Sequence, residues 1–180
     1  MKRRICLLAH NVRSLWNVGS FFRTCDAFAV EKIYLTGYTG HPPRKEIAKT
    51  ALGAEESVPW EYLQDPVTIV NALRSDGWSV VALELIETAV ELRTYSPPEQ
   101  ICLVVGHELS GVPQEILGLA EATIKISMLG TKESLNVAVA AGIALHHLRN
   151  AKPCLPATLS PRRRRRLPRP DREFPSGRTR

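Results

Sequence analysis

Cysteine is scarce in this sequence, and its placement excludes the structures that cysteines usually build. The four cysteines stand far apart, with no Cys-x-x-Cys pair and no histidine at metal-ligand spacing, at Cys6, Cys25, Cys102 and Cys154. Dispersed cysteines argue against a zinc site and against a disulfide framework, and they are typical of the reducing cytosol. We therefore predict a cytoplasmic protein that binds no metal.

Long apolar runs are absent as well. The basic start of the chain, residues 1–4, precedes a short apolar run, residues 5–9, and polar residues follow at once. This run is too short for a signal peptide and is better explained as a first buried strand. No run approaches the ~20 residues that cross a bilayer, so we expect no membrane partner.

The body of the chain has almost no net charge, although the whole chain carries +6. Residues 160–180 contain nine arginines against Asp171 and Glu173, which gives +7. The other 159 residues then hold 15 basic and 16 acidic side chains, a balance of −1. General attraction to phosphate must therefore come from local patches or from the end of the chain.

Apolar runs and helical periodicities alternate along residues 1–152. Buried strands are predicted over residues 5–9, 32–36, 57–62, 79–85, 101–105 and 123–126. Helices are predicted over residues 18–29, 46–52, 66–75, 113–119 and 134–149, with Asn17 and Ser134 as the N-caps of the first and the last. This alternation predicts one α/β domain, a mostly parallel sheet with helices on both faces. Residues 153–180, rich in proline and arginine, are predicted to form a disordered basic tail.

Three stretches place glycine and polar residues at the ends of apolar runs, where the edge of a parallel sheet meets its ligands. They are residues 17–24 (NVGSFFRT), 106–112 (GHELSGV) and 126–136 (ISMLGTKESLN). Gly106 ends a strand, where a glycine permits a positive φ and lets a ligand approach the backbone. No Gly-x-Gly-x-x-Gly follows the first strand, so a dinucleotide-binding Rossmann fold has no support.

In order and spacing, these stretches resemble the three motifs of the SpoU/TrmH family, the SPOUT-class RNA ribose methyltransferases. The first motif, Asn-x-Gly-x-x-x-Arg-Thr, is matched by Asn17, Gly19, Arg23 and Thr24. The second, Gly-x-Glu-x-x-Gly and an aliphatic residue, is matched by Gly106, Glu108, Gly111 and Val112. The third is matched by Ile126, Met128, Gly130, Ser134, Leu135 and Asn136, with Ser127 where proline is usual and Ala138 where serine often follows.

The resemblance covers about residues 3–150 and carries implications for fold and ligand. It implies a C-terminal trefoil knot, the SPOUT or alpha-beta knot, and a homodimer with the active site near the subunit interface. It also implies a site for S-adenosyl-L-methionine built largely from backbone groups. The residues that it places there are Leu83, Gly106, Ile126, Met128, Ser134 and Leu135.

The implied reaction transfers a methyl group to a ribose 2′-hydroxyl of tRNA or rRNA, with Arg23 as the residue proposed to activate that hydroxyl. Arginine is a poor general base because its pKa lies above roughly 12. Arg23 is better suited to hold the adjacent phosphate and stabilise the developing alkoxide, while a phosphate oxygen or water takes the proton. Asn17 is expected to hold Arg23 or the ribose, Glu108 to orient the arginine, and Ser134 and Asn136 to shape the site.

Two other functions fit the same fold, a catalytically inactive RNA-binding protein and a base methyltransferase. The first is disfavoured because the catalytic set is intact, and the second because the motifs resemble the ribose branch. Taken singly, each residue also has a simpler explanation. Asn17 and Ser134 could only cap helices, Arg23 could be a surface arginine, and Glu108 a solvated turn residue.

RNA contacts are predicted from basic side chains near the motifs and in the tail. The candidates are Arg13, Arg44, Lys45, Arg162, Arg163, Arg164, Arg165 and Arg166. The run of five tail arginines is either an inert solvated segment or an arm that grips phosphates and releases counterions.

Deletion of residues 160–180 should weaken RNA binding and flatten its salt dependence, because fewer phosphate contacts release fewer counterions. The methylated nucleotide should not change, since the body of the chain selects it. Binding titrations at several salt concentrations, with the modified nucleotide mapped for both chains, measure the two effects. A methyl group at a different position would contradict this division of roles.

Overall fold

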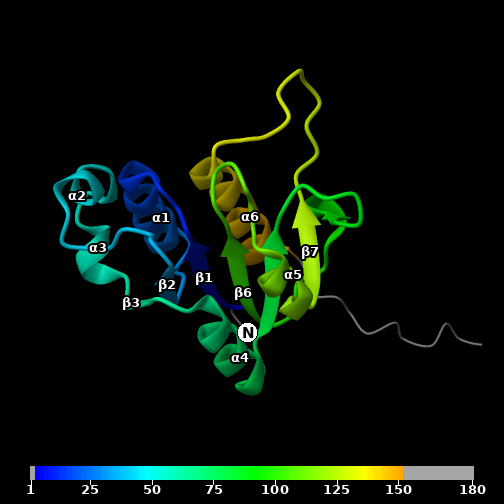
Figure 1. Cartoon of the computed structure of the whole chain (residues 1–180), viewed down its shortest axis with the longest axis horizontal. Coiled ribbons are helices and arrows are strands. Elements are labelled where there is room, and N and C mark those ends of the chain that lie inside the picture. The colour runs from blue at the N-terminus through cyan, green and yellow to red at the C-terminus, as the bar shows by residue number, and fades with distance from the viewer. Residues whose placement is uncertain (1–2, 152–180) are drawn as a thin grey trace, which may run out of the picture.

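A single sheet of parallel strands forms the centre of the computed structural model, which describes residues 3–151 (Figure 1). Its spatial order is β3-β2-β1-β6-β4-β7-β5, and every neighbouring pair is parallel. The strands are β1 Arg4–His10, β2 Lys32–Thr36, β3 Trp60–Leu63, β4 Ser79–Leu83, β5 Val90–Glu91, β6 Gln100–Val105 and β7 Ala122–Lys125. Because all strands run the same way, their carboxyl ends meet at one edge.

Helices cover both faces of this sheet, as the alternating pattern predicts (Figure 1). Side chains of β1 alternate between two cores: Leu7 packs with α1, α2 and α6, and Leu8 packs with α4 and α5. The helices are α1 Leu15–Ala27, α2 Lys45–Ala51, α3 Ala54–Ser57, α4 Pro66–Ser75, α5 Gln114–Leu119 and α6 Val137–Asn150, with one 3₁₀ turn, η1 Leu92–Thr94. Both faces of the sheet are therefore buried, which explains its continuous apolar strands.

The start of the first strand is fastened to the end of the last helix. The Arg149 guanidinium donates to the carbonyls of Phe28 and Ala29, both at 2.8 Å, and to that of Arg3. The Arg3 guanidinium in turn donates to the Pro98 carbonyl at 2.7 Å. These contacts hold the end of α6 against the segment after α1 and the start of β1.

Two predicted helix caps are wrong. Helix α1 begins three residues early, because the Ser14 hydroxyl accepts from the Asn17 amide and caps it, while Asn17 lies inside the helix. Helix α6 begins at Val137, capped by Asn136, whose Oδ1 accepts from the amides of Ala138 and Val139 at 2.9 and 3.3 Å. Ser134 stays in the preceding loop. An amide cap reaches the first-turn N–H groups as well as a hydroxyl does, so composition alone could not select between them.

Other boundaries differ where short elements meet. Residues 57–62 were predicted as one strand, but α3 ends at Ser57 and β3 begins at Trp60. The short strand β5 and the turn η1 carry no periodicity long enough to predict them. Within residues 3–151, no helix is long and apolar enough to cross a membrane. Cys6, Cys25 and Cys102 are buried free thiols, and Cys154 lies outside the described residues.

Helix α1 lies unusually close to α2 at Gly19. A Cβ atom added at Gly19 would lie 2.0 Å from the Thr50 hydroxyl and 2.3 Å from the Ile47 carbonyl oxygen. Only glycine fits such a contact. The close approach also lets the Thr50 hydroxyl donate to the Trp16 carbonyl at 3.0 Å, which ties the first turn of α1 to α2.

Replacing Gly19 by alanine should lower the free energy of unfolding by about 1–3 kcal/mol, because the extra carbon forces α1 away from α2. Gly118 in α5 is the matched control, since a Cβ there meets nothing within 4 Å. Gly118→Ala should be neutral or stabilise by up to about 1 kcal/mol. Urea denaturation of the two variants measures both changes, and equal stabilities would refute the close packing.

Candidate active site

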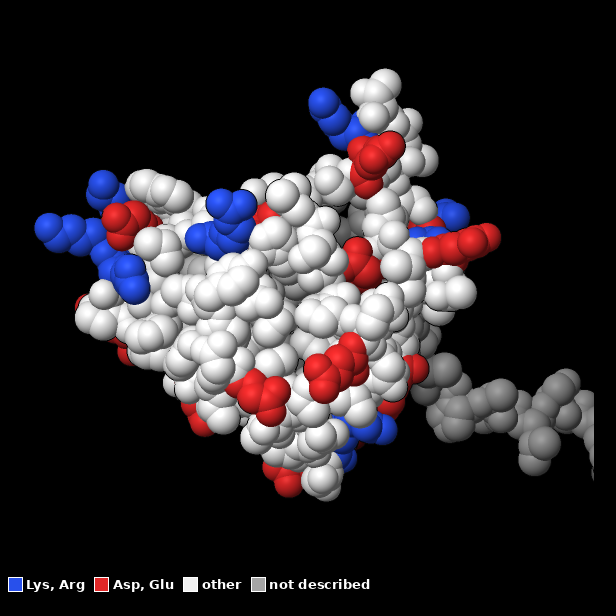
Figure 2. Space-filling model, viewed as in Figure 1, with Lys and Arg blue, Asp and Glu red and all other residues white. Residues whose placement is uncertain are grey.

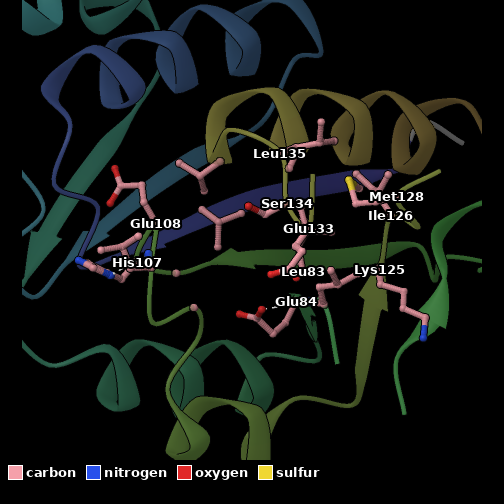
Figure 3. Close-up of a pocket in the computed structure, with 17 residues that line it drawn as sticks. Leu83, Glu84, His107, Glu108, Lys125, Ile126, Met128, Glu133, Ser134 and Leu135 are labelled. Atoms are coloured by element: carbon pink, nitrogen blue, oxygen red, sulfur yellow. Dashed lines mark hydrogen bonds between the residues drawn. The ribbon is translucent and has the colours of Figure 1, made fainter. Parts of the chain in front are cut away.

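A cleft of about 430 Å³ opens at the carboxyl ends of β4, β6 and β7 (Figure 3). This volume lies in the range of small-molecule sites, and this edge is where parallel sheets bind their ligands. All six residues predicted to bind the cofactor line this one cleft: Leu83, Gly106, Ile126, Met128, Ser134 and Leu135. The topology thus brings together strand ends and a loop that are up to 52 positions apart in sequence, from Leu83 to Leu135.

Gly106 serves the cleft differently from the prediction. Its φ is not positive; Gly111, five residues later, has a φ of +71°. A Cβ at Gly106 would lie 2.1 Å from the Gly111 carbonyl oxygen. The two residues thus close a tight loop, in which His107 and Gly111 exchange backbone hydrogen bonds of 3.1 and 2.9 Å. The absence of a side chain at Gly106 makes room for the Gly111 backbone rather than for a ligand, and this contact shapes the wall of the cleft.

Glu84 was not predicted as a site residue, yet it fastens two walls of the cleft together. Its carboxylate accepts from the Val112 amide at 2.7 Å and from the Leu85 amide at 3.0 Å. A Cβ at Gly111 would lie 2.1 Å from this carboxylate, so the second motif glycine makes room for it. The sequence offered little signal for this role, because the strand predicted over residues 79–85 includes Glu84, whereas β4 ends at Leu83.

Three motif residues from distant parts of the chain form one hydrogen-bonded row. The Asn17 side chain donates to Glu108 at 3.1 Å, and the Asn136 side chain donates to Asn17 at 3.1 Å. Glu108 also accepts from the amides of Arg13 and Ser14 at 3.1 and 3.2 Å, at the start of α1. The row therefore connects the loop after β6, helix α1 and the start of α6.

The polarity of this row follows from the charge of Glu108. An ionised carboxylate can only accept, so Asn17 must present its NH₂ group to it and its oxygen to Asn136. Asn136 then presents its own NH₂ to Asn17, which leaves its oxygen free to cap α6. Burial raises the pKa of Glu108, but hydrogen bonds from Arg13, Ser14 and Asn17 together outweigh it and hold the pKa below its ordinary value.

Two expected contacts of this row with Arg23 are not found among residues 3–151. Glu108 was expected to orient Arg23, but its carboxylate is used by the backbone and by Asn17. Asn17 was expected to hold Arg23 or the ribose, but it is 8% exposed and both ends of its amide are bonded. Arg23 lies exposed on α1, and no hydrogen bond to its guanidinium is found among residues 3–151.

The remaining predicted residues lie in two places. Ser134 is exposed in the loop before α6, on the cleft wall. Arg13, Arg44 and Lys45 are exposed near the starts of α1 and α2. The arginine run 162–166 lies outside the described residues.

The departure from the third motif at Ser127 has a structural consequence. The Ser127 hydroxyl donates to the Glu91 carboxylate, and the Lys125 ammonium donates to the Glu87 carbonyl at 3.1 Å. These bonds tether the start of the loop to the segment after β4. They restrain the backbone at a position where a proline ring would otherwise do so.

The parallel sheet, the ligand-sized cleft at its carboxyl edge and the three motif segments around it define an α/β domain that binds a small molecule beside a polar site. Comparison with known families is more specific. The chain belongs to the SpoU rRNA methylase family, whose model matches residues 4–146.

Individual relatives agree with this assignment. The chain is 34% identical over 146 residues to a tRNA (guanosine(18)-2′-O)-methyltransferase of Aquifex aeolicus. The matched region covers 81% of this chain and 68% of that protein. It is 30% identical to the 23S rRNA (guanosine(2553)-2′-O)-methyltransferase RlmP of Bacillus subtilis, over 81% of this chain and 58% of the other. An AdoMet-bound rRNA methyltransferase structure from Sinorhizobium meliloti superposes with a TM-score of 0.77 at 29% identity, over 83% of this chain and 57% of that one. The chain thus spans little more than half the length of the last two.

The depressed pKa of Glu108 predicts a pH-dependent stability. A carboxylate with a lowered folded pKa stabilises the fold above its unfolded value, roughly 4.3, and this contribution is lost as the pH falls through the folded value. Glu108→Gln should therefore lower the free energy of unfolding at pH 7 by about 1–2 kcal/mol. The difference from wild type should shrink below about pH 4.

Denaturation of wild type and Glu108→Gln across pH 3–8 measures this difference. Glu56→Gln removes an equal charge from the exposed surface of α3 and serves as the control. A Glu108→Gln deficit that stays constant down to pH 3 would show that the carboxylate's charge does not support the row.

Proposed function

We propose that this chain transfers a methyl group from S-adenosyl-L-methionine to a ribose 2′-hydroxyl of tRNA or rRNA. The observation that carries the proposal is the gathering of all six expected cofactor residues around one cleft, next to the Glu108–Asn17–Asn136 row. Relatives with ribose 2′-O-methylating names and an AdoMet-bound neighbour support the same conclusion. No observation favours the inactive RNA binder.

The residues of the cleft suit S-adenosyl-L-methionine. Leu83, Ile126, Met128 and Leu135 offer apolar surface of the kind that an adenine ring occupies, and the Gly106–Gly111 loop offers backbone groups. Glu133 and Glu84 bring negative charge to the same cleft, which suits a cationic ligand (Figure 3). The bound molecule would supply an electrophilic methyl group.

Arg23 is proposed to act on the RNA. Its guanidinium is always charged and holds a phosphate through two parallel hydrogen bonds, which positions the neighbouring ribose. The same charge stabilises the alkoxide that develops as the hydroxyl loses its proton to a phosphate oxygen or to water. The row fixes Asn17, and with it α1, so that Arg23 is presented from a rigid helix. Ser134 and Asn136 are proposed to shape the site where α6 begins.

A homodimer is proposed because α1 and α6 leave an apolar groove between them. The groove has a volume of about 690 Å³ and is lined by residues such as Phe28, Val139, Gly142 and Ile143. Val139 and Ile143 are 52% and 43% exposed and lie one turn apart on α6, so together they form an exposed apolar patch in this groove. Arg23 does not line the cleft of its own chain. A second copy bound at this groove would allow Arg23 to act at the cleft of the partner subunit.

The trefoil knot and the cytoplasmic location also belong to this proposal. The knot is supported by family membership and by the return of the chain after β7, which places Asn136 against Asn17 from the first motif. The cytoplasmic location is supported by an RNA substrate and by buried free thiols at Cys6, Cys25 and Cys102.

Replacing Arg23 by lysine should abolish methyl transfer to RNA, because lysine keeps the charge but loses the two-pronged geometry. Binding of S-adenosyl-L-methionine, measured by calorimetry, should remain within about twofold of wild type, since the side chain lies outside the cleft. Arg74→Lys on the exposed face of α4 is the matched control. Turnover of Arg23→Lys equal to that of Arg74→Lys would remove Arg23 from the reaction. If the S-adenosyl-L-methionine carries a labelled methyl group, recovery of the label on a base rather than on a ribose would favour base methylation.

A further inference from the structure

Trp16 and Tyr38 are the two most exposed aromatic side chains among residues 3–151, and both lie at the carboxyl edge of the sheet. Trp16 is 48% exposed and Tyr38 is 58% exposed. They follow β1 and β2, neighbouring parallel strands whose ends align at His10 and Thr36. Neither residue belongs to the set predicted to bind cofactor or RNA. Single exposed aromatics need no explanation, but two beside a candidate site do.

The backbone of Trp16 is held in place, while about half of the residue stays exposed. Its carbonyl accepts from the hydroxyls of Ser20 and Thr50 at 2.9 and 3.0 Å, which fixes the first turn of α1. The Lys49 ammonium lies 5.5 Å from the centre of the indole ring. The ring therefore extends from an anchored backbone and has a positive charge over one of its faces.

Tyr38 is also held by its backbone. Its amide donates to the Asn11 side chain at 3.1 Å, next to Gly37, which has a φ of +65°. The phenol ring meets the His107 ring edge-on, with centres 6.1 Å apart and planes at 83°. His107 lines the cleft, so Tyr38 stands one contact away from it. No hydrogen bond to the phenol hydroxyl is found among residues 3–151, so the ring is placed by packing alone.

Basic side chains lie along the same edge as these rings. Arg13, Lys49 and Arg44 are exposed, and Figure 2 shows Lys and Arg side chains over α2 and beside α1, with acidic side chains among those over α2 and elsewhere in the view. Arg23 follows Trp16 by seven residues, two turns along the same face of α1. The rise of an α-helix separates them by roughly 10 Å.

We propose that Trp16 and Tyr38 form a stacking platform for unpaired bases of the RNA substrate, with Arg13 and Lys49 contacting the adjoining phosphates. The inference rests on the proposed function and names its substrate class: a target nucleotide in a loop or other single-stranded stretch. Bases within a duplex stack on one another and leave no face for an aromatic ring, whereas splayed bases stack on Trp and Tyr. The short spacing from Trp16 to Arg23 places the stacked base close to the ribose that is methylated.

The test uses the full chain and two fluorescein-labelled probes, a ten-nucleotide single-stranded RNA of mixed sequence and a ten-base-pair RNA duplex. Trp16→Ala and Tyr38→Ala should each weaken binding of the single strand about tenfold, the size expected when one stacked base is lost. Duplex binding should change less than twofold. Trp16→Phe and Tyr38→Phe keep an aromatic face and should bind the single strand within about twofold of wild type. Val90→Ala, an exposed change on β5, is the control.

Tryptophan emission gives a second readout. The single strand should quench the emission of wild type, and this quenching should largely disappear in Trp16→Phe, although Trp60 and Trp78 remain. Alanine variants that bind the single strand as wild type does, or that lose duplex binding equally, would overturn the platform. So would a change in the oligomeric state of Trp16→Ala, which would assign the ring to a subunit interface.

These outcomes are separable from the proposed function. Methyl transfer is not measured in the binding experiments, so a chain that methylates no RNA can still show the aromatic effect. Conversely, a chain that methylates ribose with unchanged KM for RNA in both alanine variants retains its function and loses the platform.

Discussion

The negative charge of Glu108 is the constraint on which the arrangement of this site depends. A carboxylate accepts and never donates, so it fixes the orientation of Asn17, and through Asn17 that of Asn136. Because Asn136 is the N-cap of α6, the same charge determines how the last helix begins. Its position at the start of α1 adds a favourable interaction with the helix dipole. One ionised group therefore sets the relative placement of three distant segments.

The rest of the edge follows from close backbone contacts. Gly106 and Gly111 approach until no side chain fits between them, and Glu84 fills the space that Gly111 leaves. The cleft is thus bordered by backbone whose position is set from both sides. Arg23 and the aromatic rings lie outside it, on helix and loop surfaces that α2 and the β2 end support. The inner cleft suits a small cationic cofactor and the outer surface suits RNA, which separates the two substrates in space.

Most of the fold could be predicted from the sequence, because apolar runs buried on two faces leave a strong pattern. Strands β1, β2 and β6 appear within one residue of their expected ends. The six residues predicted to bind the cofactor were selected through motif resemblance, and a motif does not specify which residues are in contact in the folded chain. Glu84 was missed because its distant partner, the Val112 backbone amide, is brought to it only by the parallel pairing of β4 and β6. The caps at Ser14 and Asn136 were missed because several neighbouring polar residues could satisfy the same N–H groups.

The expected roles of Asn17 and Glu108 show the same limit. A motif names residues that act together but does not say which of them touch. Both were assigned to Arg23 by chemistry that is reasonable for an amide and a carboxylate, yet the folded chain uses them to join three segments. In the proposed reaction their contribution is then indirect: they connect α1 with the start of α6, and Arg23 lies on the helix they hold.

A mutant cycle measures whether Glu108 and Asn136 are coupled through Asn17. The free energies of unfolding of Glu108→Gln, Asn136→Ser and the double variant are compared with that of the wild type. Serine is chosen at position 136 because its hydroxyl can still cap α6. We expect a coupling free energy between the two substitutions of at least about 0.5 kcal/mol, and we expect it to vanish when the cycle is repeated in an Asn17→Ala background. Additive effects in the wild-type background, or a coupling that survives the loss of Asn17, would contradict it.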